Sequence, residues 1–257
     1  VITALFIALQ IQSNHIQMSY YFMFVILFFI IAYFVDAYEK KELPHFFKAS
    51  AILALAAVVG VCVNISNLYH TYEYSKETMR GKSELKQEGP AANQTSSGLD
   101  RDYITNWSYG IGETLTLLVP NVKGGGCSTT LSQNETAMAK ANPMYGNLYS
   151  QLTPYFGDQP WTAGPVYVGA FVVFLFILGC FIVKGPLKWA LLGATIFSIL
   201  LSWGKNFMGL TDFFIDYIPM YNKFRAVSSI LVIAEFTIPL LAIFALKEIL
   251  SKPDILK

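Results

Sequence analysis

Apolar and polar stretches alternate along this chain on the length scale of a lipid bilayer. Residues 18–35 are almost all Tyr, Phe, Ile, Leu and Val, and residues 229–246 are nearly as apolar. Each such side chain favours membrane insertion by about 0.3 to 0.6 kcal/mol, and about 20 of them cross a bilayer as a helix. Runs of the same kind, shorter or weaker, cover 49–67, 166–183 and 189–203. The pattern predicts a mainly α protein, a polytopic bundle of transmembrane helices.

A polar stretch, 68–165, separates the two apolar regions, 1–67 and 166–257. A connection of about a hundred residues seldom lacks structure, so we expect it to form a mostly helical extracytoplasmic subdomain. Its patterns predict three helices, near 68–85, 102–119 and 137–152.

The two apolar regions contain two special cases. Residues 1–11 are too few to span a bilayer and predict the end of a helix that starts upstream of Val1, so we expect the chain to be a fragment. Residues 210–218 place Asp212 and Asp216 one helical turn apart on an amphipathic pattern. That pattern predicts a helix lying in the membrane interface.

The lysines predict the orientation. The loops 36–48, 184–188 and 247–257 carry eight lysines between them. Because short loops rich in Lys stay in the cytoplasm, these three loops are expected on the inner face. The turn at His15, the insert and residues 205–228 then fall on the outer face.

Composition narrows the class of protein further. Only 14% of the residues are charged and the net charge is +1, so no basic surface for nucleic acid is predicted. Three cysteines predict no disulfide framework, and no metal-ligand spacing, P-loop, HExxH or GxSxG pattern occurs.

A basic pair stands just before the last apolar run. Lys223 and Arg225 fall at headgroup depth on the predicted outer face. An Arg beside a Lys at this depth suits a lipid phosphate, which the Arg can hold in a two-pronged contact. The alternative is an anchor whose charged ends reach the interface without a ligand.

Glu235 lies inside the last apolar run, followed by Pro239. An ionised carboxylate near the middle of a span costs about 2.5–3.5 kcal/mol on insertion scales. We therefore expect Glu235 to face the interior of the bundle, either at a functional site or in a hydrogen bond between helices.

Several polar residues of the predicted outer face are pocket candidates. His15 and Gln17 stand in the turn before residues 18–35, where they could bind a phosphate or a sugar. Glu113 and Asp158 are embedded among apolar and aromatic residues, as acid–base groups often are. Structural roles in turns and helix caps are the alternative for all four.

Four stretches resemble a known family. They are ALQIQSNHIQMSYY (8–21), SYGIGETLTLLVPNVKGG (108–125), YFGDQPWTAGPVYVGA (155–170) and PMYNKFRAVS (219–228). The order of these stretches and their amino-acid sequences resemble YfhO-type bacterial membrane proteins, which are grouped with the GT-C glycosyltransferases. Within that family they most resemble a Bacteroidetes-like branch. Ile16 departs from the family, which often has Pro after the turn histidine.

The resemblance implies an enzyme of the bacterial inner membrane. Such an enzyme takes a sugar from a polyprenyl-phosphate carrier, its lipid-linked donor substrate, and transfers it to an acceptor on the outer face. The catalytic carboxylate would lie upstream of Val1. Arg225 with Lys223 would contact the carrier phosphate, and the outer pocket would be lined by His15, Gln17, Glu113, Asp158 and Gln159.

Two other functions are consistent with the residues. The chain could be a non-catalytic membrane partner or scaffold that uses the insert to dock another membrane protein. It could also be a transporter, which Glu235 and Pro239 suggest, although no paired broken helices occur in corresponding halves.

Overall fold

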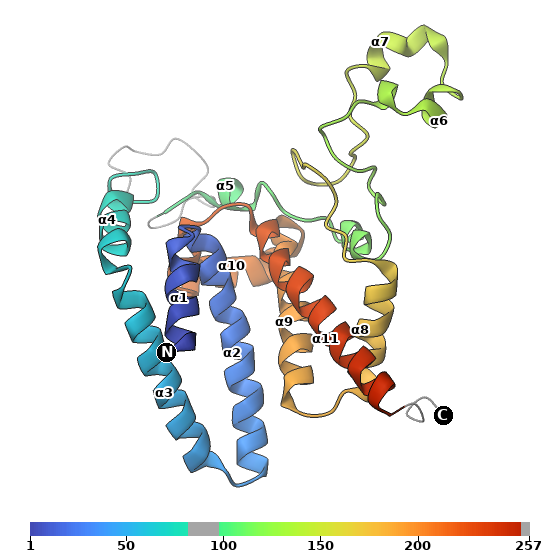
Figure 1. The fold of residues 1–257 in the computed structure, drawn as a ribbon. Helices are drawn as coiled ribbons and strands as arrows, with labels where there is room; N and C mark the ends of the chain where they lie inside the picture. Colours follow the sequence, from blue (N-terminus) through green and yellow to red (C-terminus); the bar gives the residue numbers. More distant parts are fainter. Residues whose placement is uncertain (82–97, 253–257) are drawn as a thin grey trace.

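Helices make up the regular structure of the computed structural model, which describes residues 1–81 and 98–252 (Figure 1). Among these residues, three helices are long and apolar enough to cross a membrane: α2 (Ile16–Glu39), α3 (Leu43–Cys62) and α11 (Val232–Ser251). The turn η7 (Val227–Leu231) leads directly into α11 and extends its span. The predicted mainly α, multi-pass architecture is confirmed.

A fourth candidate span is bent. Helix α9 (Pro186–Ser202) is followed by η5 (Gly204–Phe207) and α10 (Met208–Tyr217), and the two parts meet at 107°. Because of that bend α10 lies across the bundle, close to the predicted interfacial helix at 210–218. Two apolar helices are shorter, α1 (Ile2–Gln12) and α8 (Ala170–Ile182).

The bundle is organised around α9, which packs against both α2 and α11, while α8 packs against α11. Phe24 of α2 meets Phe197 of α9 and Phe214 of α10, with ring centroids 5.2 and 5.9 Å apart. Such ring pairs add about 0.5–1.5 kcal/mol to the free energy of burial. This aromatic cluster joins α2, α9 and α10 near the bend.

Helix α1 packs along α3 through small residues. A Cβ at Gly60 would stand 2.8 Å from the carbonyl oxygen of Ala4 and 2.9 Å from Cβ of Ile7, so only glycine allows this approach. Asn64 Nδ2 donates to the carbonyl of Ala8 at 3.0 Å. Close packing of small residues and a polar contact are the usual means of helix association in membranes.

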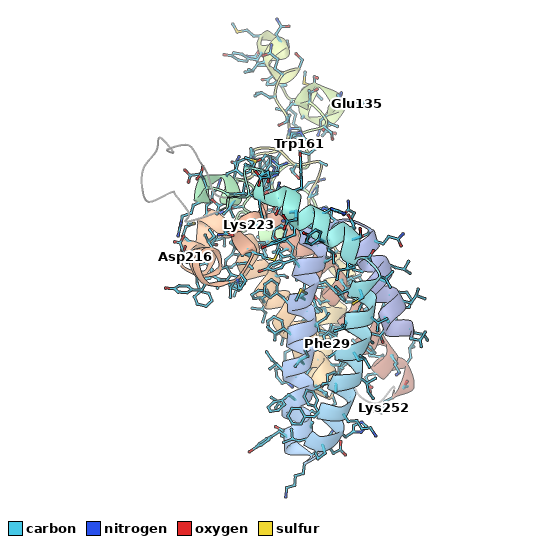
Figure 2. All side chains as sticks on the ribbon, turned by 90° about the vertical axis from the view of Figure 1, so that its left-hand side faces the viewer. Phe29, Glu135, Trp161, Asp216, Lys223 and Lys252 are labelled. Atoms are coloured by element: carbon cyan, nitrogen blue, oxygen red, sulfur yellow. The ribbon has the colours of Figure 1, made fainter. Side chains whose placement is uncertain are left out.

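The two ends of the bundle differ in charge. The α2–α3 turn, the α8–α9 turn and the last residues of α11 lie at one end of the molecule (Figure 1). The α1–α2 turn, α10 and the insert lie at the other end, and Glu135 and Trp161 project beyond the bundle there (Figure 2). The described parts of the three lysine-rich loops therefore share one end, as the orientation argument requires. Their assignment to the cytoplasm stays a prediction.

The described part of the insert contains only short helices, separated by turns and loops. They are α4 (Ile65–Lys76), α5 (Arg101–Thr105), η2 (Gly112–Leu117), η3 (Leu131–Gln133), α6 (Glu135–Met138), η4 (Pro143–Tyr145) and α7 (Gly146–Tyr149).

None of the three helices predicted for the insert forms over its predicted length. The helix predicted at 68–85 starts earlier, at Ile65, and ends at Lys76; residues 82–85 lie outside the described part. The helix predicted at 102–119 is interrupted after Thr105, because Tyr109 N donates to the carbonyl of Ser202 at 2.8 Å instead of to its own helix. Tertiary contacts override the local pattern at this point. The single helix predicted at 137–152 is replaced by short pieces: α6 ends at Met138, η4 starts at Pro143 and α7 covers only Gly146–Tyr149.

Helix α8 is shorter than the apolar run 166–183 that contains it. Gly169 has φ +111°, a conformation that a regular helix does not contain, so α8 cannot extend back past it. Just before it, Val168 N donates to the carbonyl of Leu117 at 3.2 Å. The helix starts at Ala170, so the first residues of the run tie the insert to the bundle.

Candidate functional site

Arg225 is exposed, and it contacts both Tyr103 of the insert and Gln17 at the start of α2. Its Nη1 donates to the hydroxyl of Tyr103 at 2.7 Å. Its guanidinium carbon lies 5.5 Å from the ring centroid of Tyr103 and 5.8 Å from that of Trp107. Contacts of this kind stabilise a cation by about 0.5–2 kcal/mol. Two aromatic rings from the insert therefore position a cation that stays accessible.

Gln17 supports the backbone that carries Arg225. Its Nε2 donates to the carbonyl of Arg225 at 2.7 Å and to the hydroxyl of Tyr21 at 2.9 Å. His15 precedes the first turn of α2 and is exposed, and its side chain forms no hydrogen bond within residues 1–81 and 98–252. The structure thus brings Gln17 to Arg225 and leaves the imidazole of His15 at the surface.

Lys223 is held in a different contact from Arg225. Its Nζ donates to the carbonyl of Arg80 at 2.6 Å, and Arg80 Nε donates to the carbonyl of Lys223 at 2.9 Å. Burial lowers the pKa of Lys223, because desolvation disfavours the ammonium ion. This reciprocal pair ties the segment after α4 to the loop before η7.

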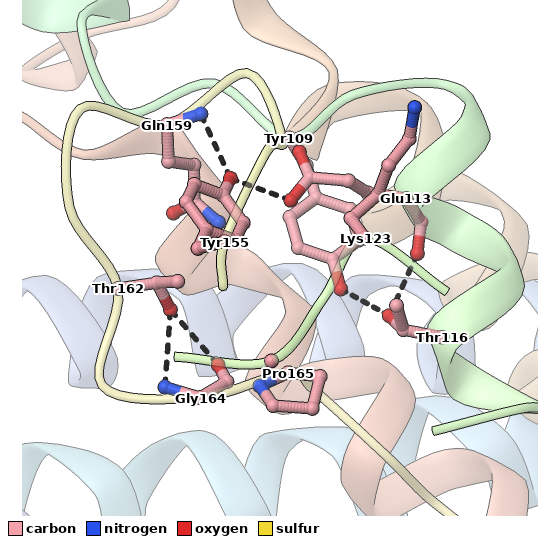
Figure 3. A pocket seen from close by; sticks show the side chains of 10 residues that line it. Tyr109, Glu113, Thr116, Lys123, Tyr155, Gln159, Thr162, Gly164 and Pro165 are labelled. Carbon is pink, nitrogen blue, oxygen red and sulfur yellow. Dashed lines mark hydrogen bonds between the residues drawn. The ribbon is translucent and has the colours of Figure 1, made fainter. Parts of the chain in front are cut away.

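Glu113 is the centre of a second cluster, formed by η2 and residues 155–159 (Figure 3). Its side chain is 2% exposed. Oε1 accepts from the hydroxyl of Tyr155 at 2.6 Å, and Oε2 accepts from the backbone N–H groups of Gly110 at 2.7 Å and Asp158 at 3.2 Å. No Lys or Arg of the described residues forms an ion pair with it. Three donors therefore replace the water that this carboxylate would otherwise bind.

Glycines permit this approach. A Cβ at Gly157 would overlap both Glu113 Oε1 and the hydroxyl of Tyr155. A Cβ at Gly110 would stand 2.9 Å from Asp158 Oδ2 and 3.0 Å from Glu113 Oε2. The GIGE and FGD motifs thus meet face to face through residues that have no side chain.

Asp158 and Gln159 link the cluster to the bundle. Asp158 Oδ2 accepts from Asn206 Nδ2 at 3.0 Å, and the carbonyl of Asp158 accepts from Lys205 Nζ at 3.1 Å. Gln159 N donates to the hydroxyl of Tyr155 at 2.9 Å, while Gln159 Oε1 accepts from Ser228 Oγ at 3.1 Å. Ser228 N donates to the carbonyl of Trp107 at 3.1 Å, and the ring of Trp107 contacts Arg225, so Trp107 connects the buried cluster to the exposed arginine.

The space beside Glu113 is small. The cavity lined by Glu113, Tyr155 and Lys123 measures about 10 Å³, which is room for about one water molecule (Figure 3). Burial, followed by the hydrogen bond to Glu113, raises the pKa of Tyr155, so its hydroxyl stays protonated as a donor. Both oxygens of Glu113 are occupied by protein donors. The geometry therefore makes Glu113 a positioning residue of the two loops.

Tyr103 also lines a larger cavity. It measures about 250 Å³ and is lined by Thr78, Met79, Gly81, Gly98, Leu99, Asp100 and Tyr103. Asp100 Oδ1 is buried there and has no hydrogen-bond partner within the described residues. Tyr103 is shared between this cavity and the contact with Arg225.

Sequence reasoning missed the aromatic residues of the site. Tyr103, Trp107 and Tyr155 carry most of its contacts, yet aromatic side chains are abundant along the whole chain. These three residues could have been singled out because they lie in the polar insert, where a large aromatic side chain usually packs against a particular neighbour.

Glu235 differs from its predicted orientation. It lies in the first turn of α11, within the span Val227–Ser251, but its side chain is exposed instead of facing the interior. The positions of α11 that face α8 and α9 are taken by apolar residues and by Thr237, which shares a 2.7 Å hydrogen bond with Thr195.

No group of three or more His, Cys, Asp or Glu side chains that could hold a metal ion occurs in residues 1–81 and 98–252. Comparison of the chain with protein-family models, with curated proteins and with solved structures found no match.

Proposed function

We propose that this protein is a glycosyltransferase-like membrane enzyme of the bacterial inner membrane. It transfers a sugar from a polyprenyl-phosphate carrier to an acceptor on the outer face. The observation that carries the proposal is the exposed guanidinium of Arg225, which two aromatic rings position at the end of the bundle opposite the lysine-rich loops.

A guanidinium in this setting suits a lipid phosphate. It stays charged at any physiological pH, and its planar fork matches two phosphate oxygens. Only Nη1 is engaged by Tyr103 among the described residues, so the other N–H groups are available to a ligand. A positive charge fixed at this point stabilises the phosphate that leaves when the sugar is transferred.

The cavity beside Tyr103 offers room for the sugar. Its volume of about 250 Å³ is that of a small ligand site, and the unpaired Oδ1 of Asp100 can accept a hydrogen bond from a sugar hydroxyl. The phosphate at Arg225 and the sugar at Asp100 would then both be next to Tyr103.

Binding of the carrier tests the proposal. The full chain in lipid nanodiscs is titrated with undecaprenyl phosphate, and the affinity is compared with that of an Arg225→Ala variant. Because hydrogen bonds to charged groups contribute about 1.5–3 kcal/mol, the variant is expected to bind at least about tenfold more weakly. Arg225→Lys, which keeps the charge but loses the fork, should fall between the two.

The controls separate the phosphate from the lipid tail. Undecaprenol, which lacks the phosphate, should bind wild type and Arg225→Ala alike. A Lys40→Ala variant removes a cation at the opposite end of the bundle and should leave the affinity for undecaprenyl phosphate unchanged. Equal binding of the phosphate by wild type and Arg225→Ala would refute the proposal.

A second candidate is a non-catalytic membrane partner, which the outward orientation of Glu235 favours. A scaffold of this kind would co-purify with another membrane protein and would be indifferent to replacement of Arg225.

A further inference from the structure

We propose that Asp100 makes the cavity beside Tyr103 selective for a sugar that carries a free amino group, which binds there as an ammonium ion. The inference rests on the proposed function, because it names the class of sugar that the lipid carrier delivers to this cavity. Asp100 is then a specificity-determining residue.

The first observation is an open acceptor on the cavity wall. Asp100 Oδ1 is buried and accepts no hydrogen bond within the described residues. None of the ion pairs found in residues 1–81 and 98–252 involves Asp100. A buried acceptor without a donor is disfavoured, and the more so when the group carries a charge. At this oxygen the protein itself supplies neither a donor nor a cation.

The second observation is that donors around the cavity are already engaged. The backbone N–H groups of Gly81, Gly98 and Leu99 each donate to a carbonyl of the protein, at 2.8, 3.2 and 3.0 Å respectively. The hydroxyl of Thr78 donates to a backbone carbonyl at 2.8 Å. These groups cannot also satisfy Asp100, so its donor has to come from a bound molecule.

The third observation is the place of Tyr103. Its hydroxyl accepts from Arg225 Nη1 at 2.7 Å, and Tyr103 also lines the cavity. Asp100 and Tyr103 are three positions apart at the start of α5, and residues with this spacing are neighbours on one face of a helix. A phosphate at Arg225 and a donor at Asp100 would therefore be close enough to belong to a single sugar phosphate.

The charge of the carboxylate selects the kind of donor. A hydroxyl group offers one hydrogen and no charge, whereas an ammonium group offers three hydrogens and a positive charge. Because a buried charge is normally paired with an opposite charge, the ammonium is the better match. An N-acetyl group is uncharged and offers a single N–H, so acetylation of the amine removes this advantage. The cavity thus favours a sugar with a free amine over a sugar with hydroxyl groups alone.

Affinities for three lipid-linked sugars test the proposal. The full chain in lipid nanodiscs is titrated with undecaprenyl phosphate that carries glucosamine, glucose or N-acetylglucosamine. The wild type is expected to bind the glucosamine carrier at least about tenfold more tightly than the glucose carrier, because only the ammonium forms a buried charge pair with Asp100. The N-acetylglucosamine carrier should bind no more tightly than the glucose carrier.

An Asp100→Asn variant connects this preference to the carboxylate. The change keeps the size of the side chain and removes its charge, and Asn is as well suited as Asp to the N-cap of α5, where residue 100 lies. Its affinities for the glucosamine and glucose carriers should become equal. Glu135→Gln, which neutralises an exposed glutamate elsewhere in the insert, is the matched control and should keep the wild-type preference.

An Arg225→Ala variant separates this inference from the proposed function. It should weaken the binding of the glucosamine and glucose carriers by the same factor, because both contain the phosphate. Equal affinities of the wild type for the two carriers would overturn the inference, while a loss of both in Arg225→Ala would still support the phosphate contact. If no carrier binds at all, the proposed function fails and the inference fails with it.

Two further results would overturn the inference. One is a preference for the glucosamine carrier that Asp100→Asn retains, and the other is tighter binding of the N-acetylglucosamine carrier than of the glucosamine carrier. The comparison of the three sugars in the wild type decides the question even if Asp100→Asn fails to fold.

Discussion

At the scale of single residues, the buried carboxylate of Glu113 determines how the outer loops meet. Its three donors come from two segments more than 40 positions apart, residues 110 and 155–158. Hydrogen bonds to a carboxylate are roughly twice as strong as hydrogen bonds to a neutral acceptor. A neutral side chain in place of Glu113 would therefore hold these three donors more weakly. Glu113 thus joins the loop of Gly110 to the loop that carries Gln159, whose side chain accepts a hydrogen bond from Ser228.

Replacement of Glu113 by Ala is therefore expected to destabilise the protein. It leaves Gly110 N, Asp158 N and the hydroxyl of Tyr155 without an acceptor in a buried place. Each unsatisfied group costs about 1–3 kcal/mol, and with partial relaxation we expect a total near 3 kcal/mol. Thermal unfolding of the detergent-solubilised protein measures the loss.

The matched control is Glu135→Ala, which removes an exposed glutamate of α6 from the same insert. Its melting temperature should equal that of the wild type. If Glu113→Ala has the same melting temperature as Glu135→Ala, the carboxylate of Glu113 does not stabilise the contact between the loops.

Part of this cluster could be predicted from the sequence. Glu113, Asp158 and Gln159 could be selected from their apolar surroundings and their motifs, and the structure places them within one hydrogen-bond network. The donors could not be predicted, because two of them are backbone N–H groups whose position depends on how the loops cross. The same limit applies to Arg225: its charge was evident, but its two aromatic neighbours come from residues 103 and 107.

At the scale of elements, an ion-pair fork attaches α10 to the insert. Arg101 Nε lies 3.1 Å from Asp212 Oδ1, and Arg101 Nη2 lies 2.6 Å from Asp216 Oδ1. The opposite side of α10 buries Phe214 and Ile215 in the core. The helix is therefore clamped between the bundle below and α5 above.

Arg101→Ala should loosen α10 without unfolding the protein. Both aspartates are nearly half exposed, so the pair contributes only about 1 kcal/mol, and the opening of α10 should become about fivefold more frequent. Hydrogen exchange of a peptide covering Met208–Tyr217 measures this, with peptides from α11 as the internal reference.

Lys76→Ala provides a comparison, since it breaks the Glu73 pair on α4, away from α10. Exchange in Met208–Tyr217 should not respond to it. Equal exchange in wild type and Arg101→Ala would mean that core packing alone holds α10.

The elements were predictable in proportion to their apolar length. The runs at 18–35 and 229–246 lie within the spans Ile16–Glu39 and Val227–Ser251, because insertion free energy depends on composition more than on tertiary contacts. The insert was harder. Residues 102–119 have a helical pattern, yet Ser108 Oγ accepts from Lys205 N at 2.8 Å and pins this segment to the start of η5, so that a continuous helix cannot form. Contacts with residues a hundred positions away do not appear in a local pattern.

At the scale of the whole molecule, the function depends on which end faces outward. The lysine-rich turns share one end, and the exposed Arg225 shares the other with the insert and α10. A carrier phosphate at Arg225 is then separated from the cytoplasm by the length of the bundle. This arrangement allows transfer on the outer face only if the lysine-rich end of the bundle faces the cytoplasm, as the positive-inside rule predicts.

Cysteine labelling decides the orientation. In a variant with Cys62, Cys127 and Cys180 replaced by Ser, a single cysteine is introduced at Tyr145 in η4 or at Lys40 in the α2–α3 turn, both exposed. A membrane-impermeant maleimide added to intact spheroplasts should modify the cysteine at 145, because the insert stands outside. It should modify the cysteine at 40 only after the membrane is permeabilised. Labelling of both positions in intact cells would put Lys40 and the insert on one face, and the chain could then not carry its loops as the lysines predict. Labelling at 40 alone would show the opposite orientation. Arg225 would then lie at the cytoplasmic leaflet and could bind a carrier phosphate only on that side.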